Sequence, residues 1–117
     1  MITKIEQLET IFNKSKQQFD DFYWSSRISA NQKLSEEFIR EFADRVDWGL
    51  ISECQKLSEG LIREFADRVD WICISVKQTL SEEFIREFAD RVDWYYINKY
   101  QKLSNSFKKE FISRIKI

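Results

Sequence analysis

Apolar and polar positions recur along this chain with a period of 23 residues. Three copies of one pattern follow each other, at residues 32–54, 55–77 and 78–100, and residues 39–48 of the first copy return unchanged in the other two. A fixed period of this length is typical of a stacked repeat array. In such an array neighbouring copies share one core, because no single copy can bury its apolar face alone. The pattern therefore predicts a repeat fold.

Each copy carries two predicted helix starts. In the first copy Ser35 can act as an N-cap, whose side chain accepts a hydrogen bond from the first helical turn. Leu34 and Ile39 have the spacing of a hydrophobic staple across that cap. Asp47 provides a second cap, again with apolar residues at the staple positions. The corresponding caps in the other copies are Ser58, Asp70, Ser81 and Asp93.

The fold class that follows is all-α: an α-solenoid of stacked helical hairpins, with one hairpin in each 23-residue copy. We expect the first copy to form a helix over about residues 35–46 and a shorter one over about 47–55. The chain has no Pro and two Gly, the residues that interrupt helices most. We expect a single domain over residues 1–117, with altered end copies at 1–31 and 101–117 that cap the array.

Apolar side chains are expected on one side of each longer helix and charges on the other. Phe42 stands on the apolar side, and we expect it to be buried, together with Phe65 and Phe88 at the same position of the other copies. Charges four residues apart, such as Glu36 and Arg40, predict ion pairs within the helix on its solvent side.

A tryptophan opens the shorter helix of every copy, at Trp48, Trp71 and Trp94. A regular ladder of aromatic rings can stack the bases of single-stranded nucleic acid. The alternative is that each ring packs the short helix against the longer one, a support it needs because isolated helices of this length are marginal in water. We favour packing, since each Trp lies in the first turn of a helix stapled to the core.

Composition removes most enzymatic chemistry. The chain has no His, the commonest general base and metal ligand near neutral pH. Its two Gly are isolated, so they form no phosphate-binding loop, and two Cys without His do not make a zinc site. Neighbouring carboxylates such as Glu41 and Asp44 are flanked by Arg, so solvated ion pairs explain them better than acid–base catalysis. We expect no catalysis, no cofactor and no metal.

Charge is distributed unevenly along the chain. The formal net charge is −1, but residues 32–100 hold ten basic and fifteen acidic side chains, hence −5, whereas residues 101–117 hold five basic and one acidic, hence +4. The repeats therefore lack the basic stripe typical of nucleic-acid binding. Few cysteines, no apolar stretch of bilayer length and no signal-peptide pattern at the N-terminus predict a cytoplasmic protein without membrane contact.

Two elements of the copies carry a family resemblance: LSEEFIREF and D-W-x-x-I. With these elements, about residues 32–107 resemble the short tandem repeats of uncharacterised proteins from giant DNA viruses, phages and some bacteria. The resemblance implies a viral or mobile-element setting. It implies no activity and no site residues, and it does not extend to residues 1–31.

The copies differ mainly in the residues that follow the Trp, where Gly49, Ile72 and Tyr95 occupy one shared position. An array that diverges on one face is one way in which repeat proteins tailor a binding surface. Relaxed constraint on an unimportant face would give the same pattern, and both explanations remain open. Toward the C-terminus this face becomes more aromatic and more basic.

We therefore expect a non-enzymatic α-helical repeat protein that binds a protein partner, because Tyr and Trp dominate binding hot spots. The resemblance makes a host protein the expected partner and the host cytoplasm the location. An inhibitor of a host defence system, such as an anti-CRISPR protein, is one concrete form. The alternative is a nucleic-acid-associated protein that uses the basic C-terminal end. The predicted partner-binding residues are Tyr95, Tyr96, Lys99, Tyr100, Lys102, Lys108 and Lys109.

Overall fold

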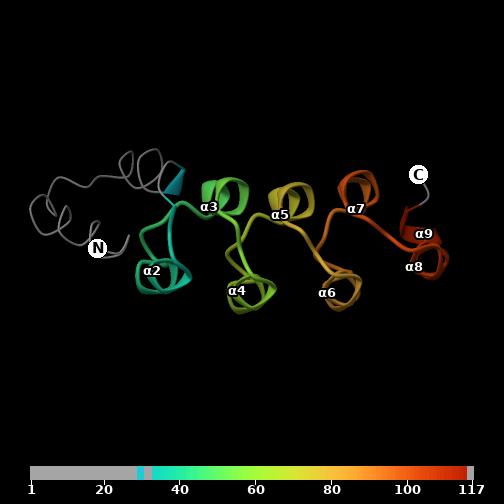
Figure 1. Ribbon diagram of the computed structural model, residues 1–117, viewed down its shortest axis with the longest axis horizontal. Helices are drawn as coiled ribbons and strands as arrows, with labels where there is room; N and C mark the ends of the chain where they lie inside the picture. Colours follow the sequence, from blue (N-terminus) through green and yellow to red (C-terminus); the bar gives the residue numbers. More distant parts are fainter. Residues whose placement is uncertain (1–28, 31–32, 116–117) are drawn as a thin grey trace, which may run out of the picture. The chain divides into compact units, whose positions relative to one another are not determined.

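The computed structural model describes residues 29–30 and 33–115 (Figure 1). Within those ranges the regular structure consists of helices, and no β-strand is found. The predicted all-α class is therefore confirmed for the described part of the chain. Except for residues 29–30, the predicted N-terminal cap lies outside it.

The chain divides into two compact units, residues 1–57 and 58–117, called here the first and the second unit. The first unit contains α2 (Glu36–Glu41) and α3 (Trp48–Cys54). The single domain expected over the whole chain stays a prediction. The second unit contains α4 (Glu59–Glu64), α5 (Trp71–Lys77), α6 (Glu82–Glu87), α7 (Trp94–Tyr100), α8 (Asn105–Glu110) and α9 (Ile112–Ile115).

Helices of the same kind are neighbours within the second unit. Figure 1 shows α4, α6 and α8 on one side of this unit and α5 and α7 on the other. The packing agrees with the picture, since α5 contacts α7 and α7 contacts α9. Successive copies of the two-helix pattern therefore stack on each other, as the 23-residue period predicts.

Each helix from α2 to α8 begins after a side chain that caps its first turn. The hydroxyl oxygen of Ser58 accepts a hydrogen bond from the backbone N–H of Leu61 at 3.1 Å. The carboxylate of Asp70 accepts one from Ile72 at 3.0 Å. These bonds supply partners for N–H groups that have none inside the helix. The six predicted caps are all confirmed, and Ser104 caps α8 in the same way.

The longer helix of each copy is shorter than the sequence suggests. A helix is expected over residues 35–46, but α2 has six residues and Phe42 is its C-cap. The backbone then turns, and the N–H of Arg45 donates to the carbonyl of Phe42 at 2.8 Å. The carbonyl of Ala43 accepts from the indole Nε1–H of Trp48 at 2.9 Å instead of continuing the helix. The tryptophan thus binds the turn that follows one helix and is the first residue of the next.

Three apolar positions of the repeat are the most deeply buried in the core of the second unit. Phe84 and Ile85 of α6 are 1% and 0% exposed, and Ile97 of α7 is 0% exposed. The longer helix therefore contributes two adjacent side chains and the shorter helix contributes one. In the copy before, the same three positions hold Leu61, Ile62 and Ile74, each of them fully buried.

The expectation that Phe42, Phe65 and Phe88 are buried is wrong, because each of them is only half-buried. The physical reason is the early end of the longer helix. Phe88 is the C-cap of α6, so its ring lies at the rim of the core. There it packs against Phe84, with 4.7 Å between the ring centroids.

The full burial of Phe84 predicts how much stability is lost when its ring is removed. Phe84→Ala should lower the free energy of unfolding by about 3–5 kcal/mol, the usual cost of deleting a buried aromatic ring. Phe84→Leu is the matched control, since Leu61 fills the same position one copy earlier, and it should cost about 1.5 kcal/mol or less. Urea unfolding followed by circular dichroism measures both variants. Equal losses for the two changes would show that this position is not enclosed.

Candidate protein-binding surface

A tryptophan joins successive copies of the second unit. The ring of Trp71 on α5 stacks on Phe84 of α6, with 6.2 Å between centroids, and lies 5.1 Å from Phe88. Its Nε1–H donates to the carbonyl of Ala66 in its own copy at 2.9 Å. The packing interpretation is confirmed for this ring, which holds two copies together and not just two helices of one copy. The arrangement recurs at the next junction with Trp94, Phe107 and Phe111.

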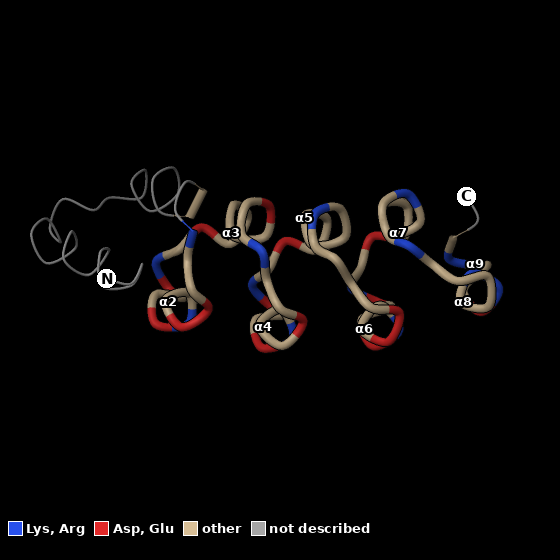
Figure 2. The backbone as a smooth tube through the Cα atoms, viewed as in Figure 1, with Lys and Arg blue, Asp and Glu red and all other residues tan. Residues whose placement is uncertain are grey.

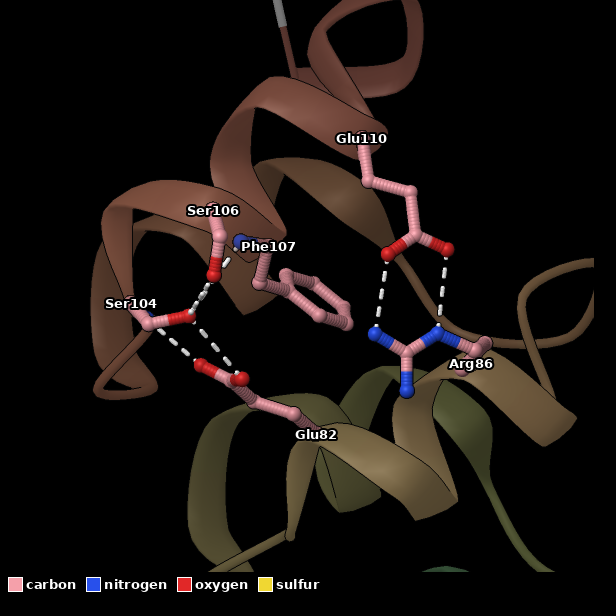
Figure 3. Close-up of polar contacts among 6 residues, drawn as sticks. All are labelled: Glu82, Arg86, Ser104, Ser106, Phe107 and Glu110. Carbon is pink, nitrogen blue, oxygen red and sulfur yellow. Dashed lines mark hydrogen bonds and ion pairs between the residues drawn. The ribbon is translucent and has the colours of Figure 1, made fainter.

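Ion pairs and hydrogen bonds link the longer helices of successive copies. Arg86 on α6 forms two parallel bonds with Glu110 on α8, from Nε to Oε2 at 3.0 Å and from Nη2 to Oε1 at 2.9 Å (Figure 3). Glu82 accepts bonds from the backbone N–H and the hydroxyl of Ser104. The ring of Phe107 lies under the Arg86 guanidinium, 5.4 Å from it. One copy earlier the same contacts join Arg63 to Glu87 and Glu59 to Ser81.

Ion pairs within the longer helix were predicted, but close ion pairs also form between the longer helices of successive copies. Glu36 and Arg40 are 3.8 Å apart in α2, as the spacing predicts. In the second unit, however, Arg63 and Arg86 form their close ion pairs with the following copy, at 2.8 and 2.9 Å. Two-pronged arginine–carboxylate pairs are stronger than single contacts, which explains the preference.

These pairs change the titration of their carboxylates. The hydrogen bonds from Arg63 hold the pKa of Glu87 below its ordinary range, because they stabilise the ionised form more than desolvation opposes it. Arg86 lowers the pKa of Glu110 for the same reason. All four side chains are nearly half exposed, so water and salt screen the attraction.

A glutamine whose role the sequence did not suggest ties the start of one copy to the two copies before it. The side-chain oxygen of Gln101 accepts from the N–H of Leu80 at 3.2 Å. Its Nε2 donates to the carbonyls of Ser75 at 3.0 Å and Gln78 at 2.7 Å. The available signal was the Gln that opens every copy. In the first unit Gln55 makes equivalent bonds to Leu34 and Ser29.

The repeat register reaches further toward the N-terminus than the first full copy. The hydroxyl of Ser29 accepts a bond from the N–H of Asp47 at 2.9 Å. In the second unit Ser75 does the same for Asp93 at 3.0 Å. These serines stand two periods apart in the sequence, so Ser29 occupies a true repeat position.

Many of the residues that are identical between copies make contacts between helices or between copies. The copies also differ at one core position, which holds Leu61 or Phe84, but most of the differing residues on α5 and α7 are exposed or half-buried. Four of them gather on α7 and are called here the tyrosine cluster: Tyr95, Tyr96, Lys99 and Tyr100. Tyr95 and Tyr100 are each 51% exposed, whereas Tyr96 is half-buried. Ile72 holds on α5 the position that Tyr95 holds on α7, and it is 53% exposed.

The tyrosine cluster is ordered by its own contacts. The ring of Tyr96 stacks on Tyr100 at 6.1 Å and meets the edge of Tyr95 at 5.0 Å. The Nζ of Lys99 lies over the rings of Tyr95 and Tyr100, 5.7 and 5.4 Å from their centroids. The predicted partner-binding residues on α7 are therefore in contact with one another, and the lysine pairs with the two exposed rings.

Charge separates the two sides of the second unit. Neither α5 nor α7 contains an acidic residue, and their charged side chains are Lys77 and Lys99. Acidic residues are abundant on α4 and α6, as the red segments of Figure 2 show. The exposed face of α5 and α7, called here the outer surface, is consequently apolar, aromatic and positive.

The remaining predicted residues lie apart from the tyrosine cluster. Lys102 follows α7 and is exposed. Lys108 and Lys109 belong to α8, on the other side of the second unit. With Asn105 and Ile112 they line an open hollow of about 380 Å³. The seven predicted residues thus form one cluster of four and a separate lysine pair, with Lys102 between them in sequence.

No three His, Cys, Asp or Glu side chains of the described residues come together in a metal-binding arrangement. Cys54 and Cys73 form no disulfide there. None of the described helices has the length and apolar character needed to span a membrane.

Comparison with known proteins gave no family for this chain. No protein-family model matches it, and the searches of curated proteins and of solved structures found no match. What is established is a regular succession of short capped helices with periodic contacts between copies of the second unit.

The glutamine contact predicts a specific loss of stability. Gln101→Ala removes three hydrogen bonds to backbone groups, and it should lower the free energy of unfolding by about 2 kcal/mol. Thr79→Lys is the matched control, because Thr79 is exposed and the other copies carry Lys at that position. It should stay within about 0.5 kcal/mol of the parent chain. A Gln101→Ala chain as stable as the control would rule out a structural role for the amide.

The ion pairs between copies predict a pH dependence. The pKa of Glu87 is lower in the folded chain than in the unfolded chain. The pair with Arg63 therefore stabilises the fold at pH values above the ordinary pKa of glutamate, and this effect is lost as the pH falls through the lowered pKa. Glu87→Gln should therefore lower the melting temperature at pH 7, and the difference from the parent should shrink in acid. Glu83→Gln is the control, because Glu83 is exposed and forms no direct ion pair among the described residues. If the melting temperatures of Glu87→Gln and the parent differed by the same amount at pH 7 and pH 3, the ion pair would not be the source of the stabilisation.

Proposed function

We propose that the chain is a non-enzymatic repeat protein that binds a protein partner through the outer surface of α5 and α7. One observation carries the proposal. Large apolar and aromatic side chains are exposed at the positions where the copies differ, at Ile72, Tyr95 and Tyr100. The identical positions are occupied by contacts between helices and copies, so packing does not explain the exposed residues.

The chemistry of the outer surface suits protein recognition. Exposed aromatic residues that gather in one patch mark interaction sites more often than scattered ones do. Tyr is enriched at binding hot spots, where it combines a large apolar area with a hydroxyl group. Stacking between Tyr96 and Tyr100 also holds the rings before any partner arrives, which reduces the entropy lost on binding.

The finer form of the proposal concerns the setting. The resemblance of the copies to tandem repeats of viruses and phages supports a host protein as the partner, met in the host cytoplasm. Stoichiometric blocking of a defence protein, as an anti-CRISPR protein does, needs a binding surface and no catalytic group. The outer surface provides the first of these requirements.

The proposal is tested by affinity capture with matched variants. Tyr95→Ala with Tyr100→Ala should weaken the complex by about 2 kcal/mol or more, roughly 30-fold, while the circular dichroism spectrum stays helical. Glu83→Ala with Asn105→Ala, two exposed changes on α6 and α8, should leave capture unchanged. Quantitative mass spectrometry of the captured proteins reports both effects. If the double tyrosine variant captured the same proteins in the same amounts as the parent, the proposal would be contradicted.

Binding of nucleic acid through the basic C-terminal end is the alternative. The specific support for it is the pair Lys108 and Lys109, which line an open hollow on α8. In that case Lys108→Ala with Lys109→Ala would abolish binding of a labelled oligonucleotide, and the tyrosine variant would retain it. Strong salt dependence of that binding would be the accompanying sign.

A further inference from the structure

We infer that the outer surface receives an acidic segment with apolar side chains from the protein partner, and that Lys99 is the group that binds its carboxylate. The inference rests on the proposed function and adds the chemistry of the partner. It follows from the charges on α5 and α7, the surroundings of Lys99 and the order of residues across the two helices.

The charges on the outer surface have one sign. The seven residues of α5 include Lys77 and those of α7 include Lys99, with no Asp or Glu in either helix. No carboxylate of the described residues forms an ion pair with either lysine. By contrast, Arg63 and Arg86 on the opposite side each have a glutamate partner. The positive charge of the outer surface is therefore available to a ligand.

Lys99 is held in place for such a contact. Its ammonium group lies over the rings of Tyr95 and Tyr100, at 5.7 and 5.4 Å from the centroids. Attraction to the ring faces restrains the lysine. The hydroxyl groups of the two exposed tyrosines are further donors that a carboxylate can use.

Apolar positions on α5 complete the surface. Because α5 packs beside α7, residues at the same repeat position lie on neighbouring helices. Ile72 corresponds to Tyr95, and Val76, which is half-buried, corresponds to Lys99. A segment lying across both helices therefore meets aliphatic side chains next to aromatic rings and a cation. Acidic residues interspersed with apolar ones complement this order.

A peptide-display selection on the immobilised full chain tests the inference. Random twelve-residue peptides should be enriched for two or more Asp or Glu together with an aliphatic or aromatic residue. Affinity of the selected peptides, measured by fluorescence polarisation, should fall about tenfold for Lys99→Glu and less for the neutral Lys99→Met. Replacing the peptide carboxylates by Lys should restore binding to Lys99→Glu. Lys108→Glu on α8 is the matched control and should bind like the parent.

Other results distinguish the inference from the function on which it rests. Selected peptides that are neutral or basic, yet need Tyr95 and Tyr100, would overturn the acidic partner and leave a protein-binding surface. Failure to select any peptide that depends on these tyrosines would overturn both. Lys99-dependent flotation with phosphatidylserine vesicles that the acidic peptides do not compete for would assign the surface to anionic lipid and overturn the inference.

Discussion

Helices of six or seven residues do not persist in water alone, and this constraint shapes the rest of the structure. The first turn of an isolated helix costs more entropy than its few hydrogen bonds return, so such short segments need outside support. In this protein the support comes from the capping Ser and Asp side chains, and in the second unit also from the following copy. Trp71 provides both kinds of support. Its ring stacks on Phe84 of the next copy, and its indole N–H donates to the carbonyl of Ala66 in its own copy.

The sequence predicted the local features of the fold well. Caps and staples span only a few residues, so Ser58 and Asp70 could be recognised without knowing what surrounds them. The length of the longer helix was not predicted, because apolar periodicity does not reveal the turn after Phe42, in which the carbonyl of Ala43 accepts the indole bond. The partners of Arg63 and Gln101 were missed for a similar reason. They lie more than twenty residues away, and a helical pattern carries no information about contacts between copies.

The candidate surface consists mainly of residues that take no part in the contacts between copies. Apart from the core position of Leu61 and Phe84, most of the residues that vary between copies of the second unit are exposed or half-buried residues of α5 and α7. Comparison of the copies located Tyr95, Tyr96 and Tyr100 from sequence alone, and the structure adds which of them are exposed. It also places the lysine, since Lys99 lies over the rings of Tyr95 and Tyr100. The sequence alone did not show that Lys108 and Lys109 lie apart from this cluster, because it does not tell on which side of the second unit α8 lies.

The central claim is that scaffold and surface are separate sets of residues, and a graft within the chain tests it most directly. Ile72→Tyr, Cys73→Tyr, Val76→Lys and Lys77→Tyr together place the four side chains of the tyrosine cluster on α5. The measurement is the free energy of urea unfolding. The account predicts that the free energy of unfolding of the graft lies within about 1 kcal/mol of the parent, because Ile72 and Lys77 are exposed and Cys73 and Val76 are only half-buried, outside the core. A loss of several kcal/mol would show that the variable residues hold the copies together, which would contradict the account.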